Sequence, residues 1–285
     1  MTIRLRTAWL AAPVALAACA AMPVAPDRPF YTKQVAAAGI PVRSSDRVRD
    51  EALAAAQAMI ADMLATRPDL AAELVRQDYT VSVIAEDEAL LDLPENAHWT
   101  KPAADDIRLT RCERLHYDER IGALSDRAYW DARARGIGGQ RTAVAEEDVL
   151  GLRSSRYYGE TILVHEFAHN VLFAIQAADP ALYAQVEAAY ANAQGQRMWF
   201  NEYAMTTVQE YWAEGTQFWF DSNKLVVVDG QRILNHADLA AYDPALYAAL
   251  AQAYSPRHRL ARDPFWMSEA RVPPGPIPRN TAEEC

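Results

Sequence analysis

The most constraining feature of this 285-residue sequence is a long apolar segment, residues 160–177, with two histidines near its middle. The segment contains neither glycine nor proline, and Asp179-Pro180 follows it closely, as expected where one helix ends and another begins. A helix that is apolar on nearly every side is buried within a domain. We therefore expect this helix to run through the centre of the fold, with the rest of the chain packed around it.

His165 and His169 lie four residues apart in this segment, and Glu166 lies between them. Residues four apart share one face of a helix, so both imidazoles could bind one cation, at about 2.0 Å from each nitrogen. Glu166 lies about 100° around the helix from His165. Its carboxylate could take a proton from water whose pKa the ion lowers to about 7. The alternative is a buried helix with two hydrogen-bonded histidines and no metal.

A catalytic zinc site usually has three protein ligands and one open position, so the third ligand decides between these alternatives. Glu187 lies on an Ala-rich segment, and we expect it to be solvated. The other candidates are Glu202, Glu210 and Glu214, in a predicted helix over 202–220. We expect Glu202 to face water, whereas the other two lie among Tyr, Trp and Phe, where a carboxylate is costly unless paired or metal-bound.

The combination of HEFAH at 165–169 with EYWAEG at 210–215 resembles the gluzincin zinc metallopeptidases of the anthrax lethal factor type. The resemblance covers residues 157–221. It implies a zincin-like domain in which Zn²⁺ is held by His165, His169 and Glu210.

The resemblance also implies roles for three neighbouring residues. Glu166 would be the general base, and Tyr203, seven residues before the third ligand, would stabilise the oxyanion that forms during hydrolysis. A spacing of seven on a continuous helix places Tyr203 and Glu210 on one face. Glu214 would lie behind the ligands and accept the free N–H of a ligating histidine.

The remaining patterns predict an α+β fold with one zincin-like metallopeptidase domain, mainly helical in its second half and with a small sheet in the first. Further helices are predicted over 46–66, 181–193 and 244–254, and the apolar runs around Asp229-Gly230 predict a hairpin over 225–234. A strand is predicted over 80–85, a weaker one over 107–115, and a structural turn at the glycines of 136–139.

The N-terminal residues 1–18 resemble a bacterial lipoprotein signal peptide, with a short basic region and an apolar stretch ending in Leu-Ala-Ala before Cys19. Cys19 would then carry the acyl chains that hold the protein at a membrane. By resemblance to the sorting of bacterial lipoproteins, Ala20 directly after the cysteine implies an outer-membrane protein that faces the periplasm. Residues 19–43, rich in Pro and Ala, are predicted to be an extended tether, and the domain is predicted over 44–285. An ordinary signal peptide with a chance cysteine is the alternative.

Charge and cysteine content limit the possible partners. The formal net charge is −10, and the sequence contains no run of basic residues. Such an acidic surface repels the phosphate backbone, so nucleic acid is excluded as a partner. In an oxidising periplasm Cys112 and Cys285 could form a disulfide, or Cys285 could remain free.

The sequence thus predicts a zinc-dependent metallopeptidase, anchored to the bacterial cell envelope as a lipoprotein, that cleaves a peptide or protein substrate. The alternative is a catalytically inactive, zinc-stabilised lipoprotein with a binding or assembly role in the envelope. The substrate and the oligomeric state are left open.

Overall fold

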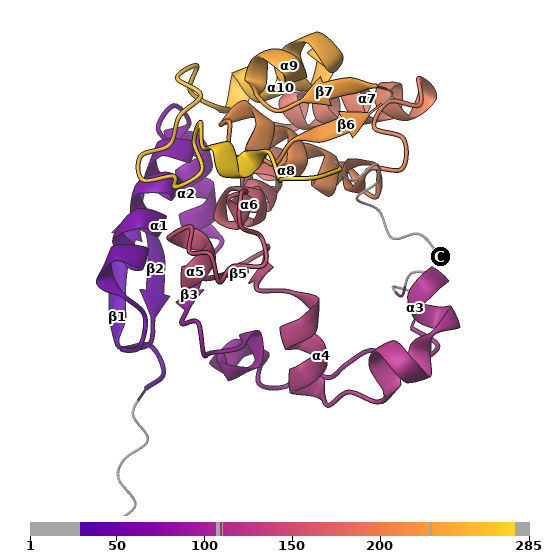
Figure 1. The fold of residues 1–285 in the computed structure, drawn as a ribbon. Helices are drawn as coiled ribbons and strands as arrows, with labels where there is room; N and C mark the ends of the chain where they lie inside the picture. Colours follow the sequence, from indigo (N-terminus) through magenta and orange to yellow (C-terminus); the bar gives the residue numbers. More distant parts are fainter. Residues whose placement is uncertain (1–28, 107–108, 110, 229, 277–285) are drawn as a thin grey trace, which may run out of the picture.

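The first half of the chain forms a five-stranded mixed sheet, and the second half is mainly helical (Figure 1). The computed structural model describes residues 29–106, 109, 111–228 and 230–276. The predicted α+β class and the single domain are thereby confirmed.

The sheet has the strand order β1-β2-β3-β5-β4, and its three central strands are parallel. Its strands are β1 (Lys33–Ala37), β2 (Ile40–Ser44), β3 (Thr80–Ile84), β4 (Gly136–Ile137) and β5 (Arg141–Ala145). The edge strands β1 and β4 pair antiparallel with their neighbours. β3 agrees with the predicted strand over 80–85, whereas β5 was not predicted.

Residues 33–44 form a hairpin, although the prediction placed them in the tether over 19–43. Ala38 and Gly39, which have φ angles of 48° and 87°, make the two-residue turn between β1 and β2. In β2 the apolar side chains of Ile40 and Val42 alternate with more exposed residues and are buried. The prolines of this segment suggested an extended tether, so the alternation of buried and exposed residues was overlooked. Because the hairpin belongs to the sheet, the domain begins before residue 44.

The two faces of the sheet are covered differently. Helices α1 (Asp50–Met63), α2 (Pro68–Arg76) and α6 (Ile162–Ala178) pack together on one face, in the main hydrophobic core that includes Val81 and Val83. The opposite face packs Ile84 and the alanines of β5 against Leu90 and Leu93. The latter face is covered by the short helices η1 (Leu90–Asp92) and η2 (Pro94–Asn96).

The segment from 97 to 134 extends away from the sheet as a small helical lobe (Figure 1). It contains α3 (Arg111–Leu115), η3 (Asp118–Gly122) and α4 (Asp126–Arg133). The weak strand predicted over 107–115 is therefore wrong for 111–115, because Arg, Glu and Leu in this segment are good helix formers. Cys112 is disulfide-bonded, and Cys285 lies outside the described residues.

The second half contains the central helix α6 and the elements packed around it. These are α5 (Glu146–Val149), α7 (Pro180–Gly195), η4 (Tyr203–Met205), α8 (Val208–Trp219), the hairpin β6 (Val226–Val228) and β7 (Gln231–Ile233), α9 (His236–Tyr242), α10 (Pro244–Ala253) and η5 (Glu269–Arg271). Within the described residues, none of the helices combines the length and the apolar character needed to span a bilayer.

The predicted helix over 202–220 is interrupted. η4 ends at Met205, and α8 begins at Val208 after Thr207, whose hydroxyl accepts a hydrogen bond from the Glu210 amide at 3.1 Å. Such a capping threonine starts a new helix, so a continuous helix is wrong for this segment.

Candidate metal centre and active site

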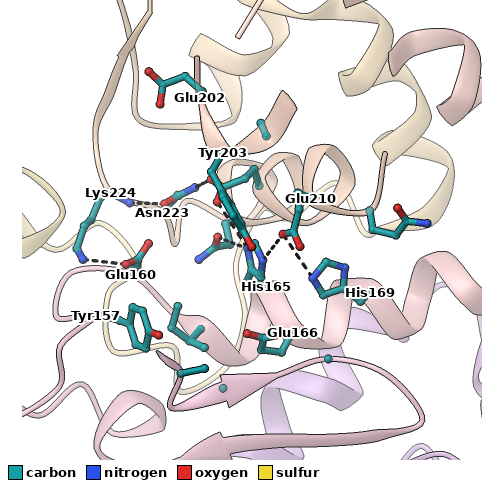
Figure 2. Close-up of a pocket in the computed structure, with 18 of the residues that line it drawn as sticks. Tyr157, Glu160, His165, Glu166, His169, Glu202, Tyr203, Glu210, Asn223 and Lys224 are labelled. Atoms are coloured by element: carbon teal, nitrogen blue, oxygen red, sulfur yellow. Dashed lines mark hydrogen bonds and ion pairs between the residues drawn. The ribbon is translucent and has the colours of Figure 1, made fainter. Parts of the chain in front are cut away.

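Helices α6 and α8 bring three potential metal ligands together (Figure 2). His165 Nε2 lies 2.9 Å and His169 Nε2 lies 3.7 Å from the same carboxylate oxygen, Oε2 of Glu210. All three ligand atoms lie within 4.8 Å of one another. Ligands that are each ~2.0–2.2 Å from a tetrahedral zinc ion are about 3.3 Å apart, so the two imidazoles and the carboxylate fit such an ion.

Gln217, which the sequence analysis missed, orients the first of these histidines. Its side-chain oxygen lies 3.0 Å from His165 Nδ1, and its side-chain nitrogen donates to the Thr161 carbonyl at 3.2 Å. Because the amide nitrogen is fixed on a carbonyl, the amide oxygen faces the ring and accepts its Nδ1–H. Nε2, on the other side of the ring, then faces Glu210 at 2.9 Å, where it could bind a cation after losing its proton.

Glu214 was expected to accept that N–H, but it is farther away than Gln217. Its Oε1 lies 3.7 Å from His165 Nδ1, and its Oε2 accepts a hydrogen bond from Asn223 at 2.7 Å. Burial raises the pKa of Glu214 to about 7. A spacing of seven from Glu210, on the same helix face, was the signal that could have identified Gln217.

Glu166 faces the same cavity from the next position on α6 (Figure 2). Burial raises the pKa of its carboxyl to about 7, the charge of His165 opposes this shift, and the charge of Glu210 adds to it. The backbone amide of Gly138 donates to the carboxylate. A carboxyl group with a pKa near neutrality can both accept and return a proton at physiological pH.

Tyr203 reaches the site from η4 rather than from α8. Its ring centroid lies 6.3 Å from that of His165, and its hydroxyl is hydrogen-bonded to Glu210. Burial raises the pKa of the hydroxyl above its ordinary value, and the nearby carboxylates raise it further. The hydroxyl therefore keeps its proton and remains a hydrogen-bond donor, as the predicted role requires.

The pKa values of the three potential ligands are shifted by burial and by the charges of one another. Burial alone would lower the pKa of His165, but Glu210, Glu166 and Glu214 raise it to about 10. Burial and the charge of His165 lower the pKa of His169 to about 4. For Glu210 the effect of burial is outweighed by the two histidines, and its pKa is lowered. The chain thus holds a carboxylate and one neutral imidazole, both of which can bind a cation.

The structural turn predicted at the glycines of 136–139 is confirmed for Gly138 and Gly139, which lie in the connection from β4 to β5, whereas Gly136 belongs to the edge strand β4. This segment presses against α6. A Cβ atom on Gly138 would lie 2.7 Å from His169 Cδ2 and 2.8 Å from the Glu166 carbonyl oxygen. Only glycine allows this approach, and the Gly139 amide is fixed by a 3.0 Å hydrogen bond to the Asn170 side chain.

The cluster of His165, His169 and Glu210 lies at the wall of a cavity of about 810 Å³. Its walls come from β4, α6, η4, α8 and the segment after α8, and from Tyr157 and the 97–134 lobe, which contributes Trp130 and Arg133. The cavity is large enough for several residues of a peptide or for a comparable small molecule.

The other acidic candidates do not join this group of ligands. Glu187 is exposed on α7, as expected. Glu202 was expected to face water, but it is only 3% exposed, because the chain at this position folds into the turn of η4 instead of the outer face of a helix. It points away from His165 (Figure 2).

Comparison with known proteins gives a likeness to solved structures only. No protein-family model matches the chain, and no curated protein matches its sequence. Among solved structures, the chain is similar to the Pro-Pro endopeptidase of Paenibacillus alvei, with 14% sequence identity and a TM-score of 0.43 over 70% of this chain and 91% of that one. The geometry of the site, rather than this likeness, is the basis for the function proposed below.

Proposed function

We propose that this protein is a zinc-dependent metallopeptidase. The observation that carries the proposal is the convergence of His165, His169 and Glu210 within 4.8 Å, at the wall of a cavity that also contains Glu166. Two imidazoles and one carboxylate form a typical ligand set of catalytic zinc sites.

In this proposal each residue has one task. His165, His169 and Glu210 would hold Zn²⁺, which would polarise the substrate carbonyl and lower the pKa of water to about 7. Glu166 accepts the proton of the attacking water and passes it to the leaving amine, as its pKa near neutrality allows. Tyr203 donates a hydrogen bond to the oxygen that becomes negative in the tetrahedral intermediate.

A peptide is the favoured substrate because an edge strand lines the cavity. β4 is the last strand of the sheet, and Gly136, Ile137 and Gly138 all face the cavity. An extended peptide can add to such an edge through main-chain hydrogen bonds, which would hold it across the metal site.

The test combines metal content with cleavage of a peptide library. We expect about one zinc per chain and chelator-sensitive cleavage. Glu166→Gln should retain the metal but lower kcat by at least 100-fold, because the variant has no general base. Glu187→Gln, which changes an exposed acid on α7, is the matched control and should retain full activity.

Two results would contradict the proposal. Full activity of Glu166→Gln would remove the assigned base. Zinc binding without cleavage of any library member would instead favour the inactive, zinc-stabilised lipoprotein that the sequence leaves as an alternative.

We further propose that the protein is anchored in the outer membrane through a lipidated Cys19 and faces the periplasm. The support is the Leu-Ala-Ala-Cys sequence, since residues 1–28 lie outside the described part of the chain. Mass spectrometry of the mature N-terminus should detect acyl chains on Cys19, and Cys19→Ala should move the protein out of the membrane fraction. An unmodified cysteine would refute the anchor.

A further inference from the structure

An ion pair lies beside His165, on the side away from His169 (Figure 2). Lys224 Nζ donates to Glu160 Oε1 at 2.8 Å, and the two side chains are 30% and 19% exposed. Both residues line the cavity. Neither belongs to the proposed catalytic group, so the pair calls for another explanation.

The pair is held on a rigid frame. The Thr161 amide donates to the Ser222 carbonyl at 2.9 Å, which joins the start of α6 to the segment after α8. Arg271 donates to the Asn223 carbonyl at 2.8 Å and thereby fixes the same segment from behind. The backbone beside both charged residues is therefore fixed by hydrogen bonds.

The pair presents a donor and an acceptor side by side. The Lys224 ammonium has three hydrogens, of which one is donated to Glu160, and the Glu160 carboxylate has a second oxygen. An acidic ligand group would meet the charge of Glu160, and a basic one would meet that of Lys224. An apolar group would remove water from both charges and replace none of their hydrogen bonds, which is costly.

We propose that Lys224 and Glu160 form a specificity subsite for a neutral side chain that both donates and accepts hydrogen bonds, best matched by the carboxamide of Gln or Asn. This inference rests on the proposed peptidase function and names the substrate class of the same cavity. A site built to hydrogen-bond a ligand discriminates strongly against analogues that lack the polar group.

The position of the Lys224–Glu160 pair indicates which residue of the substrate it would contact. His165 lies three residues after Ile162, the first residue of α6, which corresponds to a rise of ~4.5 Å, and Glu160 lies two non-helical residues before Ile162, which adds at most ~6.6 Å. An extended peptide advances ~3.3 Å per residue. The carboxamide therefore belongs to a residue within about three positions of the scissile bond.

The test uses quenched fluorescent peptides that differ only by Gln, Leu, Glu or Lys at each of the three positions on either side of the scissile bond. At one position we expect kcat/KM for Gln to exceed that for Leu, Glu and Lys by about 10-fold or more. The neutral double variant Glu160→Gln/Lys224→Met should reduce the ratio of Gln to Leu below about 3-fold by improving cleavage of the Leu peptide.

Two further variants separate specificity from folding. The exchanged pair Glu160→Lys/Lys224→Glu restores the ion pair in reverse and should retain the preference for Gln. Glu73→Gln/Arg76→Met removes a pair on α2, outside the cavity, and should leave specificity unchanged.

The subsite is refuted if the wild type cleaves Gln and Leu peptides equally well, or if the neutral double variant keeps the wild-type preference. If no peptide is cleaved, the proposed function fails, and fluorescence anisotropy of the same peptides on zinc-loaded Glu166→Gln decides the subsite separately. Tighter binding of the Gln peptide supports the subsite, whereas equal binding or no binding refutes it.

Discussion

His165 is held between two partners, Gln217 on Nδ1 and Glu210 on Nε2. The Gln217 amide fixes the orientation of a buried imidazole and at the same time satisfies the Thr161 carbonyl. One neutral side chain thus prepares the ring to bind a cation through Nε2.

We predict that Gln217→Leu weakens zinc binding by about 10- to 100-fold, because the ring loses the acceptor that orients it. It should also reduce the free energy of unfolding by ~1–3 kcal/mol, since two buried polar groups lose their partner. Gln217→Glu keeps an acceptor for Nδ1 and should bind zinc more tightly than the Leu variant. Competition with a fluorescent chelator measures both affinities, and equal affinity of wild type and Gln217→Leu would contradict the orienting role.

Asp148 is a buried acid that should make stability depend on pH. Burial raises its pKa from 3.8 to about 7, although the Ser155 hydroxyl donates to it. Between pH 4 and 7 the folded state therefore holds a proton that the unfolded chain releases, so this group lowers stability as the pH rises.

We predict that Asp148→Asn, which cannot ionise, gains stability relative to the wild type between pH 4.5 and pH 8. Urea unfolding at both values measures the difference. Asp105→Asn, at an exposed position, is the control and should show no such gain. A difference between Asp148→Asn and wild type that does not change with pH would argue against the buried proton.

At the residue level, the helical spacing of polar residues within apolar segments identified four residues that line the cavity: His165, Glu166, His169 and Glu210. It missed Gln217 and Lys224. A helical spacing indicates which residues share a face, but a neutral amide or a lysine has many uses, so only the tertiary contact reveals its role.

At the scale of elements, β4 must lie close to α6 for the site to have its shape. Gly138→Ala would force its Cβ into the Glu166 carbonyl oxygen, at 2.8 Å, and that backbone atom cannot move without displacing the helix. We predict a loss of ~1–3 kcal/mol in the free energy of unfolding together with weaker zinc binding.

Gly195→Ala is the matched control, because a Cβ at the end of α7 would meet nothing within 4 Å. That variant should be neutral or slightly stabilising. Chemical denaturation of both variants measures the difference, and equal stability would show that β4 can move away from α6.

The elements predicted best are the long periodic helices α6, α7 and α10, whose boundaries lie close to the predicted ones. Short elements were predicted less well, because few residues define their period. The predicted helix over 202–220 is divided at Thr207, whose side chain caps the start of α8. The strand β5 was not predicted because a short buried strand cannot be distinguished by its pattern from other short apolar runs.

At the scale of the whole molecule, a bound metal should stabilise the fold by linking α6 to α8. A ligand present at 1,000 times its Kd adds about 4 kcal/mol, which for a domain of this size corresponds to a rise in Tm of roughly 10 °C. We predict such a rise when zinc is added to the chelator-treated protein, and none for His169→Ala. Identical melting with zinc and with chelator would show that the three side chains bind no ion.

The imidazoles come from α6 and the carboxylate from α8, with the whole of α7 between them in the sequence. A growing polypeptide that has emerged only as far as α7 offers a cation two donors, and the third arrives when α8 docks. Capture of the proposed ion would therefore belong to the last stages of maturation, and the proposed activity would begin only after α8 has docked.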